Sequence, residues 1–385
     1  MKRSTDRILT THVGSLPRPS ELVPLMRAVE RGEPHDEGAR AALVRQAVRD
    51  VVGKQIAHGL DIVNDGEMGK PGFINYANER LAGFERAATS GKSQWAGTRE
   101  TNAFPEFYAL AARGSEDKRL RMLCTGPITY QGQAQIRADI ETLKAALPEG
   151  RYAEAFLPSV SPAMLAAFQR NAYYASEEEF LYAIAEAMRE EYQAIVEAGF
   201  LVQIDDPGIL LHYMRAPDMR LEDWRKWAQV RIAALNHSLR GISPERVRYH
   251  TCHGINMGPR VHDMPLEHYI DLMLKVEAGG YSFEAANPRH EHEWRLWEKA
   301  KLPEGKVLIP GVITQSTVLV EHPELIADRI ERYASVVGRE NVIASADCGF
   351  ASSATADEIH PSIVWAKFKS LAEGARIAGS RLYRG

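Results

Sequence analysis

The sequence predicts an α/β protein built as a single (β/α)8 TIM barrel with long insertions in its βα-loops. Three observations lead to this fold class. Short apolar runs rich in β-branched residues recur along the chain, and most are followed by apolar residues at helical spacing. This alternation is typical of a parallel sheet. Eight such runs suit a closed barrel, and the first is not followed by the G-x-G-x-x-G turn of an open dinucleotide-binding sheet.

Each predicted strand is an apolar run that ends in a polar or glycine-containing turn. In chain order we expect strands at 8–15, 60–67, 121–127, 200–207, 247–254, 281–288, 307–313 and 341–350. The connecting helices have apolar residues at helical spacing with charged residues between them. They are clearest at 37–58, 176–198, 265–278, 321–336 and 361–378.

The chain is longer than a bare barrel, which needs about 250 residues, so the surplus is expected in loops. The stretch 84–120 is rich in small and charged residues, and 145–175 carries the turn-forming sequences LPEG and LPSVSP. We predict that both are insertions. Residues 1–385 are then expected to form one domain.

The charge balance and the hydropathy pattern exclude several classes of protein. Lys and Arg total 47 and Asp and Glu total 51, which gives a formal net charge of −4 with no basic block for a nucleic acid. The first 15 residues lack the apolar run of a signal peptide, and no stretch approaches the roughly 18 apolar residues of a membrane span. We therefore expect a cytoplasmic protein that binds neither nucleic acid nor membrane, with homo-oligomers left open.

The cysteines offer a first candidate for chemistry. There are only three, Cys124, Cys252 and Cys348, which is too few and too odd a number for a disulfide framework. They are therefore either buried thiols or thiolates that bind a metal or react.

Two of these cysteines fall at the ends of different predicted strands. His250 and Cys252 are two residues apart in one strand and so point to the same side, Glu284 ends the next strand, and Cys348 ends the last. In a barrel the carboxyl ends of all strands meet at one face, and imidazole, thiolate and carboxylate are all zinc ligands. A free cysteine is more often a small buried hydrophobe and H-x-C alone is a weak motif, so the coincidence of strand ends favours a metal site.

Six sequence blocks carry a family resemblance that covers nearly the whole chain. They are TTHVGSLPRP, DIVNDGE, CTGPIT, QIDDP, HTCHG with the later Glu284, and SADCGF. In this order they resemble the catalytic half of cobalamin-independent methionine synthases. The resemblance implies a Zn²⁺ ion held by His250, Cys252, Glu284 and Cys348, a small-molecule thiol as substrate, and an alkyl donor as second substrate.

The resemblance also implies where the amino-acid end of the thiol binds. The backbone at Val13 and the side chain of Ser15 would hold the carboxylate, and Glu67 and Asp205 would hold the amine and act in catalysis. An ammonium group needs acidic neighbours, and a carboxylate needs donors at a turn, so the residue types fit. From the residues alone, Ser15 is better read as a helix cap and Glu67 as a solvated loop carboxylate. His12 lies near the predicted mouth and could orient a ligand.

Two positions depart from the family pattern. Where the family has a folate-stacking tryptophan after its T-G-P block, this chain has Gln133, which we expect to contact substrate. Where the family has a histidine that acts as an acid after strand seven, this chain has Ser316, which we expect to act in catalysis. The identity of the alkyl donor therefore stays open.

The sequence thus predicts a zinc-dependent enzyme that transfers a methyl or other alkyl group to a substrate thiolate, of the methylfolate–homocysteine methyltransferase type. PGVITQSTVLVEHPELI resembles relatives that include epoxyalkane:coenzyme M transferase, so thiol–epoxide addition or its C–S lyase reversal is the alternative. A zinc barrel that acts only as a scaffold is a third reading. The RHEHEW stretch at 289–294 is expected to be solvated or structural, because alternate residues do not share a helix face.

Overall fold

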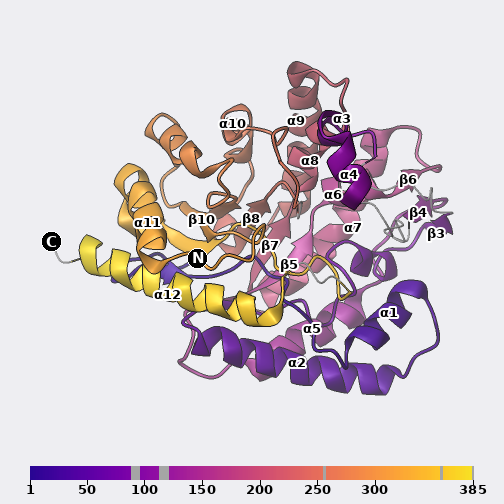
Figure 1. The fold of residues 1–385 in the computed structure, drawn as a ribbon. Helices are drawn as coiled ribbons and strands as arrows, with labels where there is room; N and C mark the ends of the chain where they lie inside the picture. Colours follow the sequence, from indigo (N-terminus) through magenta and orange to yellow (C-terminus); the bar gives the residue numbers. More distant parts are fainter. Residues whose placement is uncertain (88–95, 112–120, 255–256, 356–358, 384–385) are drawn as a thin grey trace.

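The computed structural model describes residues 1–87, 96–111, 121–254, 257–355 and 359–383. Eight parallel strands form one sheet in the order β1, β11, β10, β9, β8, β7, β5, β2, which curls into a nearly closed barrel (Figure 1). The predicted TIM-barrel fold is confirmed. The strands are β1 (Leu9–Thr10), β2 (Ile62–Asn64), β5 (Glu154–Val160), β7 (Leu201–Asp205), β8 (Val247–Thr251), β9 (Gly280–Phe283), β10 (Val307–Ile313) and β11 (Ile343–Ala346).

The first and second strands close the barrel. The backbone N–H of Asp61 donates to the carbonyl of Thr10 at 3.1 Å, and the Thr11 hydroxyl donates to the carbonyl of Ile62 at 3.0 Å. On its other side β1 pairs with β11, with Leu9 in register with Ile343. Every strand therefore has a neighbour on both sides, and their carboxyl ends face the same way.

The barrel interior is filled by side chains that point inward from alternate positions of the strands. The buried cluster consists of Leu9, Ile62, Phe156, Leu201, Val307, Ile309 and Ile343. Arg248 of β8 also lies inside, with its guanidinium carbon 3.8 Å from the Phe156 ring centroid. This packing makes the interior a solid core, so a substrate can enter only at the carboxyl ends of the strands.

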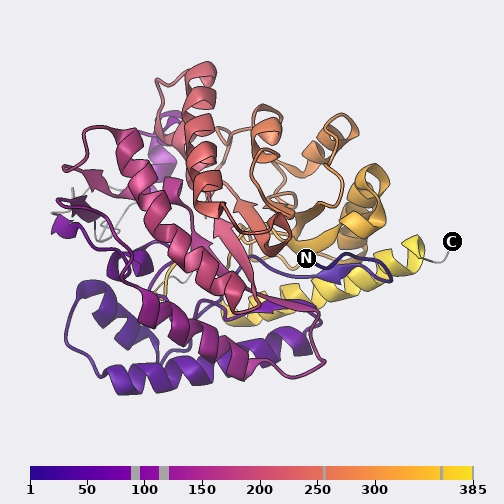
Figure 2. The same cartoon turned by 180° about the vertical axis from the view of Figure 1, so that it is seen from behind.

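Helices surround the barrel (Figures 1 and 2). Four of the five predicted helices are confirmed, and the fifth, at 265–278, contains only a short α10 (Ile270–Met273) after a 3₁₀ turn. Two long helices were not predicted from the sequence, α5 (Gln133–Ala146) and α9 (Leu221–Leu239). The confirmed helices are α2 (Glu37–Ala57), α7 (Glu177–Glu197), α11 (Pro323–Val337) and α12 (Pro361–Leu382). None of the helices in the described part of the chain is long and apolar enough to cross a membrane.

The predicted third barrel strand is wrong. Residues 121–124 form β4, which pairs with β3 (Phe84–Ala87) and β6 (Arg170–Asn171) in a separate three-stranded sheet. The barrel strand is β5, inside the stretch predicted to be an insertion. The proline within β5 and the prolines on either side of this strand are typical of a loop, because proline is rare in strands with partners on both sides.

The other predicted insertion lies within a long excursion between β2 and α5. It holds β3, α3 (Arg99–Ala103), α4 (Pro105–Ala111) and β4, all outside the barrel. In Figure 1, α3 and α4 lie beside α8 (Gly208–Arg215), and Arg99 donates to the carbonyls of Tyr213 and Ala216 at the end of that helix. The excursion therefore reaches from one side of the barrel to the loops that follow β7 and β8.

Candidate metal and thiol site

Three strand ends bring the predicted metal ligands to one place. His250 is in β8 and Cys252 follows that strand directly, Glu284 follows β9, and Cys348 lies just beyond β11. One ligand atom each from His250, Cys252 and Cys348 lie within 4.8 Å of one another, and the two sulfur atoms are 3.1 Å apart. All three side chains are buried.

The imidazole of His250 has one nitrogen available for a ligand. Its Nδ1 lies 3.1 Å from the Ser282 hydroxyl, while its Nε2 is buried with no hydrogen-bond partner. Burial lowers the pKa of His250 to about 3, so the ring is neutral. With the proton on Nδ1, shared with Ser282, Nε2 presents a lone pair. An orphaned imidazole nitrogen beside two free thiols fits zinc, which favours nitrogen and sulfur donors.

The two thiols are coupled to each other. The pKa of Cys252 is raised well above its usual value by its hydrogen bond with Cys348, and burial acts in the same direction. Two thiols this close share a proton more easily than they both ionise. A divalent cation between them would reverse this preference, because it stabilises both thiolates.

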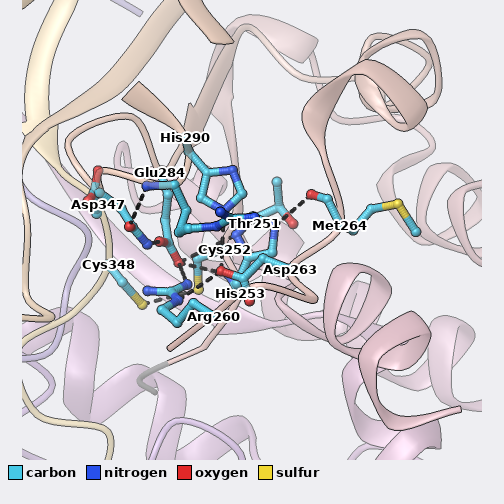
Figure 3. A network of polar contacts seen from close by, with 12 residues as sticks. Thr251, Cys252, His253, Arg260, Asp263, Met264, Glu284, His290, Asp347 and Cys348 are labelled. Atoms are coloured by element: carbon cyan, nitrogen blue, oxygen red, sulfur yellow. Dashed lines mark hydrogen bonds and ion pairs between the residues drawn. The ribbon is translucent and has the colours of Figure 1, made fainter. Parts of the chain in front are cut away.

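Glu284, the fourth expected ligand, is not part of the 4.8 Å group. Its Oε1 accepts from the backbone N–H of His253 at 2.8 Å and from Arg260 Nη2 at 2.9 Å, and its Oε2 accepts from Asn287 at 3.1 Å (Figure 3). Burial alone would raise the pKa of Glu284, but the Arg260 charge and the His253 side chain hold it well below the ordinary value. Glu284 is thus a buried carboxylate with its own set of donors.

A charged network that the sequence did not reveal lies behind Glu284. The His290 ring stacks on that of His253, with centroids 4.2 Å apart, and its two nitrogens lie 3.0 Å from Glu293 and 3.2 Å from Asp263. Burial would lower the pKa of His290, but hydrogen bonds with Asp263 and Glu293 raise it to about 10. A histidine that donates from both nitrogens has no lone pair for a metal. The RHEHEW stretch therefore contributes a buried cation here, as a structural role would require.

The residues expected to bind the amino-acid end of a thiol also meet beside the cysteines. Glu67 Oε1 lies against Gly14, where a Cβ would be only 2.9 Å away, and Ser15 Oγ lies against Gly349, where a Cβ would be 2.1 Å away. Gly349 directly follows Cys348. Gln203 donates to the carbonyl of Val13 and, at 2.8 Å, to Asp205. Val13, Ser15, Glu67 and Asp205 thus converge on one wall of the mouth.

This wall holds two buried acids, Glu67 and Asp205, with the buried cations Arg18 and Lys70 near them. Glu67 is 3% exposed and its Oε2 has no hydrogen-bond partner, with Arg18 Nη2 at 3.9 Å. The pKa of Asp205 is raised well above its usual value by burial and by the nearby Glu67 carboxylate. Two buried acids that repel each other favour a cation placed between them.

Three predicted residues make their hydrogen bonds outside the ligand set and the wall. Gln133 at the start of α5 is exposed and bonds Glu190 of α7 at 3.0 Å. His12 bonds Gln55 of α2 at 2.9 Å and packs on Phe368 of α12, so it faces the helix layer. Ser316 is half-buried beyond β10, with its hydroxyl 2.7 Å from that of Thr314. None of their recorded partners is one of the ligand or wall residues.

Comparison with known proteins identifies a matching family and several similar proteins. The sequence matches the family described as cobalamin-independent synthase, catalytic domain, over residues 8–150 and 163–364. A methionine synthase of Sulfurisphaera tokodaii is 25% identical over 341 residues, which cover 88% of this chain and 85% of that protein. A methionine synthase of Thermococcus kodakarensis is 23% identical over 393 residues, which cover 97% of this chain and 94% of that protein.

Solved structures give the same fold. A B12-independent methionine synthase from Shewanella sp. W3-18-1, in complex with selenomethionine, superposes with a TM-score of 0.74 at 19% identity and covers 98% of this chain and 99% of that one. A putative vitamin-B12-independent methionine synthase from Listeria monocytogenes gives a TM-score of 0.66 at 19% identity, with 96% and 98% covered. With the family match over most of its length, this chain belongs to the cobalamin-independent synthase family and carries that family's catalytic domain.

Proposed function

We propose that this protein is a zinc-dependent enzyme that transfers a methyl group to the sulfur of homocysteine or a closely related amino-acid thiol. The observation that carries the proposal is the cluster of His250, Cys252 and Cys348 ligand atoms within 4.8 Å at the carboxyl ends of two barrel strands. The family membership and relatives named methionine synthase support it.

The metal ligands in this proposal are His250 Nε2, the sulfur atoms of Cys252 and Cys348, and as the fourth the carboxylate of Glu284, which Arg260 holds in the absence of a metal. A bound zinc ion would lower the pKa of a substrate thiol so that it reacts as the more nucleophilic thiolate at neutral pH. Ser282 keeps the imidazole oriented through its contact with Nδ1. The solid barrel core below these residues excludes water from one side.

The wall beside the cysteines would bind the amino-acid end of the substrate. Glu67 and Asp205 would pair with the ammonium group, since Glu67 Oε2 has no hydrogen-bond partner and the pKa of Asp205 is raised by burial and by the Glu67 carboxylate. Ser15 and the backbone near Val13 would contact the carboxylate. An ammonium between the two acids relieves their repulsion, so binding would favour an amino-acid thiol over one without an amine.

The alkyl donor would enter from the side of the mouth where Ser316 and Thr314 lie. The Gln133 side chain is engaged by Glu190, which leaves it no part in stacking on a folate ring. This contact favours a second candidate reaction, in which the same thiolate opens an epoxide. Both reactions use the same thiol site and differ only in the electrophile.

The test begins with metal content. We expect about one zinc per chain in the wild type, retained in Cys124→Ser and lost in Cys252→Ser and Cys348→Ser. Cys124 is the matched control, because it is also a buried free thiol but lies in the side sheet. Wild-type protein that binds no zinc contradicts the proposal, as does zinc that survives in the double serine variant.

Activity is then followed by the mass of the product. Homocysteine is incubated with a methylated folate in one arm and with small epoxides in the other. Methionine in the first arm supports methyl transfer, and a hydroxyalkyl thioether in the second supports the epoxide reaction. The protein is a scaffold if it binds zinc, forms no product in either arm, and shows no change in the zinc X-ray absorption spectrum when thiol is added.

A further inference from the structure

We propose that Gln203 is a positioning residue that orients two parts of the wall at once. One part is the backbone at Val13 and Gly14, on the side that would bind the substrate carboxylate, and the other is the Asp205 carboxylate, which would bind the ammonium group. This inference rests on the proposed function and deepens it, because it names a residue inside the barrel that sets the preference for an amino-acid thiol.

The first observation is that one buried amide joins two strands that are not neighbours. Gln203 of β7 is fully buried, and its Nε2 donates to the carbonyl of Val13 and, at 2.8 Å, to Asp205 Oδ1. Both partners are acceptors, so the NH2 side of the amide must face them. Val13 follows β1, and β2 and β5 lie between β1 and β7 around the barrel. The side chain therefore links segments that no strand pairing connects.

The second observation is that side chains from the barrel interior hold two consecutive carbonyls after β1. The carbonyl of His12 accepts from Arg248 Nη2 at 3.1 Å, and that of Val13 accepts from Gln203. Gln203 and Arg248 are paired in register on β7 and β8. The backbone after β1 is thus fixed from below by a pair of neighbouring side chains.

The third observation concerns the N–H groups of the same peptide units. In a trans peptide unit the C=O and the N–H point in opposite directions, and the described residues contain no cis peptide bond. With both carbonyls held toward the barrel interior, the N–H groups of Val13 and Gly14 are turned away from it. Among the residues that the structure describes, none accepts a hydrogen bond from either group. Adjacent N–H groups that face the same way form an anion site, which suits a carboxylate.

The same amide also fixes the acid. Its bond to Oδ1 restricts the rotation of the Asp205 carboxylate. No group in the described part of the chain donates to the other oxygen, which is left for a cation beside Glu67. Gln203 thus fixes the N–H groups and the acid relative to each other, so a substrate that carries both a carboxylate and an ammonium group meets partners already in place.

The experiment measures thiol affinities from the absorption spectrum of the Co²⁺-substituted protein. The probes are homocysteine, sulfanylbutanoate without the amine, sulfanylpropylamine without the carboxylate, and propanethiol without either. In Gln203→Met, which is similar in size but cannot donate, we expect homocysteine to bind about thirtyfold more weakly and the two analogues about fivefold more weakly. Propanethiol should bind as it does to the wild type, since it uses only the metal.

Gln55 supplies the matched control. It is another fully buried glutamine, but it lies in α2 and bonds the backbone of Asn64, at 2.8 Å and 3.0 Å, and the His12 ring. Gln55→Met should lower stability and leave the preference for homocysteine over propanethiol unchanged. Should Gln203→Met fail to fold, Gln203→Asn replaces it, because the shorter amide cannot reach both partners and the same order of losses is expected.

The outcomes separate the two proposals. Homocysteine affinity that stays at the wild-type value in a folded Gln203 variant overturns the inference, and so does an equal loss for homocysteine and propanethiol, which would mark a merely structural role. Both results leave the proposed function standing. A wild-type protein that takes up neither zinc nor Co²⁺, or that binds propanethiol as tightly as homocysteine, contradicts the proposed function itself.

Discussion

At the scale of single residues, the buried imidazolium of His290 makes stability depend on pH. Its pKa in the folded protein is about 10, raised by Asp263 and Glu293 against the effect of burial. Below pH 6.5 the ring is protonated in both the folded and the unfolded state, so the stabilisation is fully present. Between pH 6.5 and 10 only the folded state keeps the proton, and the contribution declines to nothing as the pH rises through this range.

We therefore predict that His290→Gln lowers the free energy of unfolding by about 3–5 kcal/mol at pH 6, because it removes the positive charge that two buried carboxylates share. The deficit should shrink by about 1.4 kcal/mol for each pH unit above 6.5. Urea unfolding of both proteins between pH 6 and pH 9 measures it. A difference that does not vary with pH would count against a charged ring.

His237 provides the matched control for this prediction. Its Nε2 lies 2.9 Å from Glu186, but both side chains are substantially exposed, at 38% and 53%. Since solvent screens such a pair, His237→Gln should change stability by less than about 1 kcal/mol at any of these pH values.

The sequence could name the candidate ligands but not the residues that hold them. Cys252 and Cys348 were recognisable because thiols are rare in this chain and both follow predicted strands. Arg260 and Asp263 had no such signal, because charged residues in a loop without periodicity are indistinguishable from solvated ones. His12 was placed at the mouth from its position in the chain, whereas the side chain of a strand residue can equally face the helix layer.

At the scale of elements, a glycine fixes how closely α12 packs on α11. A Cβ on Gly374 would lie 2.4 Å from Ile326 Cγ2 and 2.9 Å from the carbonyl of Pro323, both in or beside α11. Glycine is otherwise a poor helix residue, so its place in α12 reflects this close approach.

We predict that Gly374→Ala destabilises the protein by about 1–3 kcal/mol through overpacking, even though alanine has the higher helix propensity. Gly379→Ala in the same helix is the control, since the nearest atom to its new Cβ would be at 3.8 Å, an ordinary contact. It should be neutral or stabilising by up to about 1 kcal/mol. Thermal unfolding of the two variants compares them, and equal melting temperatures would argue against the close packing.

The strand that the sequence misplaced also has an element-scale explanation. β4 and β5 are both short apolar runs, and local pattern does not say which sheet a run joins. β5 contains Pro158 and is preceded and followed by further prolines, so its local signals oppose its central position. Tertiary packing overrides them, with β2 on one side and β7 on the other.

At the scale of the whole molecule, the Asp61 carboxylate strengthens the seam between β1 and β2, where the barrel closes. Asp61 Oδ2 accepts from the Thr10 backbone N–H at 3.0 Å and lies 3.1 Å from the Thr10 hydroxyl, and the Asp61 N–H donates to the Thr10 carbonyl. This exchange joins the strands at the two ends of the sheet order.

We predict that Asp61→Ala lowers the free energy of unfolding by about 1–3 kcal/mol, because it leaves the partly buried N–H of Thr10 without its acceptor. Amide hydrogen exchange should speed up first in β1 and β2. Asp6→Ala is the control, since this side chain is 78% exposed and its removal should cost less than about 0.5 kcal/mol. Equal amide exchange rates for β1 and β2 in the Asp61→Ala and Asp6→Ala variants would exclude a special role for the seam.

The barrel itself was predictable because its evidence is repeated along the chain. Seven of the eight predicted strands belong to it, and an error in one repeat does not alter the alternation of strands and helices. The path of the excursion was not predictable, since it is set by single contacts. Arg99 bonds the end of α8, and Glu100 accepts the backbone N–H of His262.

The seam has one more consequence, for the nascent chain. β1 pairs with β11, so the first strand of the barrel to leave the ribosome cannot find one of its two neighbours until Ile343 has been made. Until then both β1 and the strand at the growing end expose unsatisfied backbone groups, to which other strands can add. We expect newly made chains to depend on chaperones until β11 has been made, and products that end before β11 to aggregate rather than fold.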